Sequence, residues 1–164
     1  MHPIVTQHPF NSRSFFSNAE TKSLGKGIEV WRGLFQSLRP TVGRLFINVD
    51  ISSGLMYKSG PLIPVCLDFL GVPGNQVGAL RENLSPQQRR SLSRFLRGLR
   101  VEYGKAGEKR RASIQGLSDR GADQEMFANA SGQQMSVAQY FRQTRNMPLQ
   151  HSGLLCVRVR VIAL

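Results

Sequence analysis

Basic side chains that could bind phosphate gather in one part of this 164-residue chain. Residues 81–111 hold ten of the 22 basic residues and only three of the 10 acidic ones. Arginine outnumbers lysine by 17 to 5, and the planar guanidinium group binds phosphate oxygens in pairs. With a formal charge of +12 and a pI of about 11.0, the chain is predicted to bind a polyanion such as nucleic acid. The alternative is a charge that only keeps the chain in solution.

Groups that could carry enzyme chemistry are sparse. Histidine occurs only at positions 2, 8 and 151, and no two acidic residues are spaced to enter one cleft. Cys66 and Cys156 lie 90 residues apart and form no CxxC motif, which argues against a zinc or redox site and fits a reducing compartment. Residues 104–109 fail the spacing of a phosphate-binding loop. We therefore expect no enzyme activity, no metal, no cofactor and no small-molecule substrate.

The first half of the chain predicts strands and one helix. Residues 28–38 and 43–52 are predicted strands, joined by a turn at Arg39-Pro40; the second strand alternates apolar and polar side chains. Residues 1–20 predict a loose arm, and Gly54 and Gly60 are expected to interrupt the chain. Residues 61–70 predict a short helix with Pro61 at its first position and Gly71 at its exit. This helix is apolar on nearly every side, so we expect it to be buried.

The second half begins after a break at residues 71–75 and predicts a small β barrel. Ser85 is a predicted N-cap for a helix that has apolar residues on one side. Three arginines occupy the other side and form either a phosphate-attracting ridge or a solvated face: Arg90, Arg94 and Arg97. Short strands are expected at 99–103, 109–117, 132–136, 147–149 and 154–162, with a loop at 118–126. Ser136 is predicted to cap a second helix at residues 137–144.

Two stretches resemble a known family. Residues 29–40 (EVWRGLFQSLRP) and 45–52 (LFINVDIS) resemble the linker that precedes the PAZ domain in eukaryotic Argonaute proteins. Residues 96–102 (LRGLRVE), Phe127 and residues 136–141 (SVAQYF) resemble the PAZ domain itself. The resemblance implies an α+β, mainly β fold: an SH3/OB-like barrel with an inserted strand–helix lobe, preceded by a linker of strands and one apolar helix. It implies a flexible arm at 1–14, a linker at 15–72 and an RNA-binding domain at 73–164.

The resemblance also implies a site between barrel and lobe for the 3′ end of a small guide RNA. Tyr140 matches a tyrosine that contacts phosphate, and Phe127 matches an aromatic residue of the lobe. Basic residues at matching positions are Lys105, Lys109, Arg110 and Arg145. Each aromatic is alternatively a core residue, and Arg110 and Arg145 are alternatively solvated.

Several positions depart from the family pattern. Ala112 replaces a common aromatic residue, Lys105 and Gly153 replace common histidines, and Thr144 replaces a basic residue. We therefore expect RNA binding that is weaker and more sensitive to salt than in the family.

The expected function is an RNA-binding module in small-RNA gene silencing (RNA interference). Its expected partners are single-stranded or overhang-bearing small RNA and silencing-complex proteins. The family's MID and PIWI domains have no counterpart in these residues, which suggests a truncated chain without cleavage activity. The alternative is a structural fragment that docks on a partner protein or is inert. With no apolar run of about 18 residues and no basic–apolar leader, we expect no membrane contact and a cytoplasmic location with a nuclear fraction.

Overall fold

The computed structural model describes residues 7–9, 13–81, 84–104, 109–129 and 132–161. The chain splits into two compact units, Met1–Gly71 (unit 1) and Val72–Leu164 (unit 2). Each unit is described by itself below. The predicted domain limits at residues 14 and 72 stay predictions.

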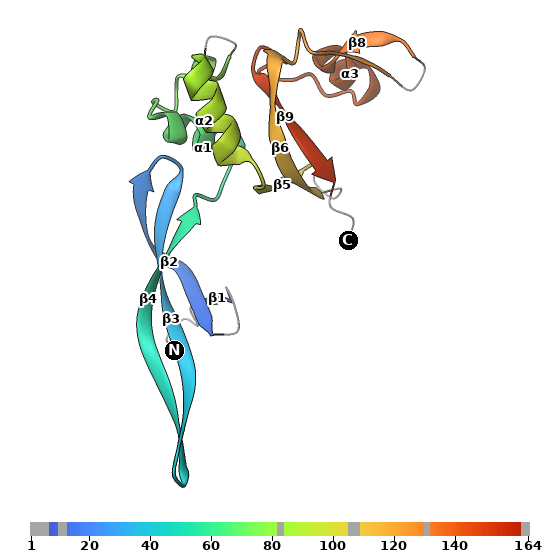
Figure 1. The fold of residues 1–164 in the computed structure, drawn as a ribbon. Helices are drawn as coiled ribbons and strands as arrows, with labels where there is room; N and C mark the ends of the chain where they lie inside the picture. The colour runs from blue at the N-terminus through green and yellow to red at the C-terminus, as the bar shows by residue number, and fades with distance from the viewer. Residues whose placement is uncertain (1–6, 10–12, 82–83, 105–108, 130–131, 162–164) are drawn as a thin grey trace. The chain divides into compact units, whose positions relative to one another are not determined.

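Unit 1 contains an antiparallel sheet of four strands in sequence order. The strands are β1 (Gln7–Pro9), β2 (Ser14–Gly25), β3 (Ile28–Thr41) and β4 (Arg44–Tyr57). β3 and β4 pair along their whole length and form a long twisted ribbon (Figure 1). The alternation at residues 43–52 therefore predicted a strand correctly. The expectation of a loose arm at residues 1–20 is wrong for its described part, because β2 begins at Ser14 and β1 pairs with it; residues 1–6 and 10–12 lie outside the described residues.

The turn between β3 and β4 lies two to three residues beyond its predicted place. It is formed by Val42 and Gly43, where the φ angle of Gly43 is +74°, the left-handed region that favours glycine. Pro40 lies inside β3 instead. It is accommodated there because, within the described residues, the pairing of β3 with β2 reaches only as far as Phe35, so Pro40 pairs with β4 alone.

Gly54 does not interrupt the chain but lies within β4. The ring of Phe16, which is 6% exposed, packs over Gly33 and Gly54. A Cβ atom on Gly54 would come within 2.9 Å of that ring. Glycine is therefore needed at this position for close packing and not for a turn.

Helix α1 (Leu62–Leu70) completes unit 1. Pro61 is its N-cap and not its first residue, and Gly71 ends the helix with a φ angle of 70°. The expected burial is confirmed for Val65, Cys66 and Leu67. The carboxylate of Asp68 accepts hydrogen bonds from Lys58 Nζ and Gly27 N, each at 3.3 Å, and so fixes α1 to the turn between β2 and β3.

Unit 2 is α+β and contains two small sheets. A 3-10 helix, η1 (Val77–Leu80), leads to α2 (Pro86–Leu96). The larger sheet has the order β5 (Arg100–Tyr103), β6 (Arg110–Gly121), β9 (Leu155–Val161). The smaller sheet is the hairpin of β7 (Met126–Ala128) and β8 (Gln134–Ser136), which leads into α3 (Val137–Thr144). α3 lies beside β8 and forms a strand–helix lobe with it (Figure 1).

The predicted class, mainly β with a strand–helix lobe, is confirmed, with three corrections. The larger sheet is not closed into a barrel in the part of the chain that the structure describes. Residues 147–149 are not in a strand, and β6 extends through much of the predicted loop to Gly121. β6 can extend this far because it bulges twice against β9 while keeping its pairing.

Helix α2 has the two faces that the sequence predicted. Ser85 and Gln88 form a reciprocal capping box, and Pro86 is the first helical residue. On the inner face Leu92 and Leu96 are 2% and 0% exposed. Arg90, Arg94 and Arg97 are exposed on the other face. The helix thus covers the core of unit 2 and presents a basic surface to solvent.

Candidate nucleic-acid interface

The strand–helix lobe holds α3 in place through its N-terminus. Ser136 Oγ accepts a hydrogen bond from Gln139 N at 3.2 Å, and Gln139 Oε1 accepts one from Ser136 N at 3.0 Å. Val137 N and Ala138 N, which a helix leaves without helical partners, donate to the carbonyl oxygens of Glu125 and Ala122. The start of α3 is therefore fixed to the segment between β6 and β7.

This anchoring brings together the two aromatic residues predicted for the site. The ring centroids of Phe127 and Tyr140 lie 5.4 Å apart with an interplanar angle of 77°. Phe141 packs on Tyr140 at 6.0 Å and 87°. We call these three residues the aromatic cluster. All three are half-buried, so each is neither sealed in the core nor fully exposed.

Phe141 was not among the predicted site residues. The sequence predicted only that Phe141 lies on the same side of the helix as Tyr140. That placement does not distinguish a core residue from a site residue. The edge-to-face geometry of the cluster is one that aromatic rings favour, and half-buried rings can offer a face to a nucleic-acid base.

Lys109 and Arg110 lie at the start of β6, and both are exposed. Glu102 on β5 accepts a hydrogen bond from Arg111 Nε at 3.0 Å and pairs with Lys109 Nζ at 3.9 Å. Part of the positive charge at this end of the sheet is therefore balanced. Arg110 forms no ion pair within the described residues.

Arg145 is the C-cap of α3 and is exposed, as is Thr144. No hydrogen bond, ion pair or ring interaction among the described residues links Lys109, Arg110 or Arg145 to the aromatic cluster. Lys105 lies outside the described residues. The RNA-binding roles of these residues therefore stay predictions.

Ala112, which replaces an aromatic residue common in the family, is buried in this structure. Its side chain is 0% exposed, and its neighbours in the sheet are Val101 and Val161. It faces the core of unit 2, where space is limited. Its small size therefore fits a packed position, and its expected effect on RNA binding stays a prediction.

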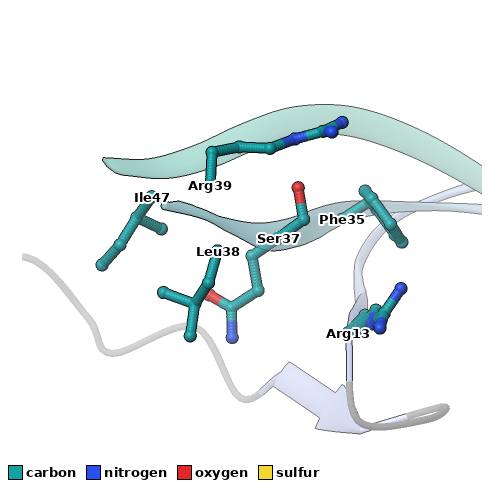
Figure 2. A pocket seen from close by; sticks show the side chains of 7 residues that line it. Arg13, Phe35, Ser37, Leu38, Arg39 and Ile47 are labelled. Carbon is teal, nitrogen blue, oxygen red and sulfur yellow. The ribbon is translucent and has the colours of Figure 1, made fainter. Parts of the chain in front are cut away.

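A separate hollow of about 560 Å³ lies on unit 1 (Figure 2). Its lining residues are Arg13, Phe35, Gln36, Ser37, Leu38, Arg39 and Ile47. Among the described lining residues there is no carboxylate and no imidazole, so these residues offer no acid–base pair. It contains none of the predicted site residues.

Both cysteines are poor nucleophiles. Burial raises the pKa of the Cys66 thiol to about 11, and burial also raises the pKa of Cys156. Both thiols are protonated at neutral pH, and the thiolate is the reactive form. Within the described residues, no cluster of three or more His, Cys, Asp or Glu side chains could hold a metal ion. No described helix is long and apolar enough to cross a membrane.

Comparison with known protein families decides the assignment. Residues 75–161, more than half of the chain, match the PAZ domain. The chain belongs to the PAZ domain family. Residues 11–58 match the Argonaute linker 1 domain, so a linker and a PAZ domain follow each other here as in Argonaute proteins.

Curated relatives and a solved structure extend this result. The chain is 34% identical to protein argonaute 1D of Oryza sativa subsp. japonica over 162 residues, which cover 96% of this chain and 15% of the relative. It is 32% identical to the argonaute of Schizosaccharomyces pombe over 156 residues, which cover 90% of this chain and 18% of the relative. The chain thus spans less than a fifth of the length of these relatives.

The crystal structure of Kluyveromyces polysporus Argonaute with a guide RNA matches the fold with a TM-score of 0.60. The match covers 99% of this chain and 20% of that one, at 13% identity.

Proposed function

We propose that unit 2 of this PAZ-family chain binds the 3′ end of a small single-stranded or overhang-bearing RNA. The observation that carries the proposal is the half-buried ring pair of Phe127 and Tyr140 on the strand–helix lobe. Proteins hold single strands through bases stacked on such rings and basic groups along the backbone. The resemblance to the PAZ family supports a preference for the 3′ end of the RNA. The structure of the similar Kluyveromyces Argonaute was solved with a guide RNA.

In this proposal each side chain has a distinct task. Phe127 stacks on a terminal base, and the Tyr140 hydroxyl donates a hydrogen bond to a phosphate oxygen. Lys109, Arg110 and Arg145, with Lys105, neutralise nearby phosphates. The chain would serve small-RNA silencing as a binding module without cleavage activity, alongside silencing-complex proteins in the cytoplasm and, in part, the nucleus.

The test compares one RNA with a free 3′ hydroxyl and the same RNA with a bulky 3′ block. We expect the block to weaken binding by at least about tenfold, because a pocket that encloses an end excludes a longer one. Equal affinity for both RNAs would refute end recognition.

Tyr140→Phe tests the proposed hydroxyl contact. Loss of a hydrogen bond to a charged acceptor costs about 1.5–3 kcal/mol, or roughly 10- to 100-fold in the dissociation constant. Tyr57→Phe is the matched control in unit 1 and should leave RNA affinity unchanged. If the two variants bind RNA alike, Tyr140 does not contact phosphate.

A second candidate function, docking on a partner protein, is favoured by the ribbon of β3 and β4. One face of it carries apolar side chains that are exposed in the structure: Leu38, Leu45, Ile47, Val49, Ile51 and Leu55. Contiguous apolar surfaces of this kind mark interaction sites. Size-exclusion chromatography separates the two functions: an RNA-binding monomer supports the first, and self-association that Ile47→Ser with Ile51→Ser abolishes supports the second.

A further inference from the structure

Helix α2 carries a row of arginines that the 3′-end site does not use. Arg90, Arg94 and Arg97 are all exposed and follow one another on one side of the helix. Arg90 and Arg94 lie about 6 Å apart along the helix axis, and Arg97 is the C-cap directly after the last helical residue. In the part of the chain that the structure describes, their side chains form no hydrogen bond or ion pair. The row therefore presents three uncompensated charges.

A groove lies between this row and strand β6. Two hollows, of about 420 Å³ and 520 Å³, share the lining residues Ser93, Arg97, Gln115 and Leu117. The two hollows adjoin at these residues, and together we call them the α2–β6 groove. The helix approaches the strand closely here: a Cβ atom on Gly116 would lie 3.5 Å from Ser93 Oγ.

A β-bulge places a polar side chain in this groove. Ile114 pairs with Val159 and Gly116 pairs with Arg158, so Gln115 is an extra residue on β6. A bulge redirects the side chain that it contains. Gln115 is exposed and lines both hollows, and its amide offers two donors and one acceptor group.

Acidic side chains at the groove do not cancel the arginine row. Asp119, which lines one hollow, is held by Arg89 through its carboxylate at 3.1 Å and its carbonyl oxygen at 3.0 Å. Glu125 pairs with Arg158 at 3.2 Å. Each acid is thus matched by an arginine outside the row. Among the described residues, the groove keeps the net charge of Arg90, Arg94 and Arg97.

We propose that the α2–β6 groove binds the sugar–phosphate backbone of single-stranded RNA, as a second site apart from the 3′-end site. Guanidinium groups bind phosphate oxygens in pairs, and the Gln115 amide can hydrogen-bond to a ribose 2′-hydroxyl or a base edge. An acidic peptide would also meet the charge. The groove favours RNA because Leu117 and the buried Ile114 are its only large apolar lining side chains among the described residues, which leaves little to anchor apolar peptide residues.

The experiment uses a circular single-stranded RNA, which has no 3′ end. The test variant combines Arg90→Gln, Arg94→Gln and Arg97→Gln in the full chain. Neutralising three phosphates contributes about 2 to the slope of log affinity against log salt. We expect the variant to lose about this slope and on the order of 10- to 100-fold in affinity. A control variant with Arg32→Gln, Arg39→Gln and Arg44→Gln removes the same charge from unit 1 and should lose far less.

Three outcomes overturn the proposal. The first is an equal loss in the test and control variants, which would mean that net charge alone governs binding. The second concerns a variant with Arg90→Lys, Arg94→Lys and Arg97→Lys, which keeps the charge of the row. If its log affinity falls with log salt as shallowly as that of the glutamine variant, the charge of the row does not bind phosphate. The third is a poly-glutamate peptide that displaces the RNA at equal charge concentration, which would assign the groove to acidic peptides. Circular RNA cannot report on end recognition, so failure of the proposed 3′-end function would leave this result unchanged.

Discussion

The ribbon of β3 and β4 in unit 1 and the α2–β6 layer in unit 2 use apolar residues in opposite ways. In the ribbon the apolar side chains are exposed, up to 85% for Ile51. In unit 2 the apolar residues of α2 and β6 face each other, and Leu92, Leu96 and Ile114 are buried. Alternation of apolar and polar residues therefore identifies a strand but does not show that the unit itself covers the apolar face.

The two units also differ in charge, and unit 2 carries most of the net positive charge. Residues 72–164 contain 15 of the 22 basic and 6 of the 10 acidic side chains. The ribbon has few charges on its apolar face, where Leu34 is opposite Ile51 and Leu38 is opposite Ile47. We infer that unit 2 is suited to a polyanion and the ribbon to an apolar protein surface. The following predictions test this contrast, beginning with the largest expected effect.

Leu96→Ala should destabilise unit 2 by about 2–5 kcal/mol, because it leaves a cavity under α2 in a well-packed core. The loss of stability is measured by urea denaturation in which hydrogen exchange of the unit 2 amides reports unfolding. A cost below 1 kcal/mol (roughly the effect of a surface substitution) would mean that α2 does not cover a packed core.

The stability of unit 1 should fall as the pH rises from 9 towards 11. The folded state keeps the Cys66 proton, whose pKa is raised from 9.0 to about 11 by burial, while the unfolded chain releases its proton first. Stability is therefore complete below pH 9 and is lost by about 2–3 kcal/mol across this range. Fluorescence of Trp31 monitors unfolding, and the Cys66→Ala variant should lack this part of the pH dependence. The same slope in both proteins would show that Cys66 is accessible to water.

Ala112→Tyr should destabilise unit 2 by about 1–3 kcal/mol, because a ring must enter a fully buried position. The family pattern, which commonly has an aromatic residue at this position, predicts instead that the variant binds RNA more tightly. Thermal unfolding and RNA titration of the same variant distinguish the two. A stable variant with tighter RNA binding would show that position 112 opens to the site.

Ile51→Ser on the ribbon should change the free energy of unfolding by less than about 0.5 kcal/mol, since the side chain is already in water. Its effect should appear instead as reduced self-association in analytical ultracentrifugation. Val65→Ser, at a buried position in α1, is the contrasting variant in unit 1. A large stability loss at Ile51 would mean that the isolated chain buries this face.

Local signals in the sequence predicted most elements of the fold. Ser85-Pro86 and Ser136 predicted both helix starts in unit 2 because capping depends on a few adjacent residues. The turn after β3 was misplaced because Pro40 within a strand and Pro40 in a turn have the same local signature. Gly54 was misread because its need for space depends on Phe16, which lies far away in the sequence.

The site was less accessible to sequence reasoning than the fold. The assignment of Phe127 and Tyr140 to one site came only from the family resemblance, and the ring-to-ring contact that the structure shows was not predicted. The burial of Ala112 and the bulge at Gln115 depend on how β9 pairs with β6. Pairing between strands more than 30 residues apart leaves no local mark, so neither feature could be derived from the sequence.

The pairing of β2 with β3 stops at Phe35, while β3 and β4 continue together to the turn at Val42 and Gly43. In the described part of unit 1, each strand of the outer ribbon therefore pairs with one neighbour, and isolated two-stranded hairpins are marginally stable in water. Deuterium should enter the amides near Thr41 and Arg44 well before those near Trp31. The tip of the ribbon would then act as an adaptable arm, whose ordering contributes an entropic cost to any contact it makes.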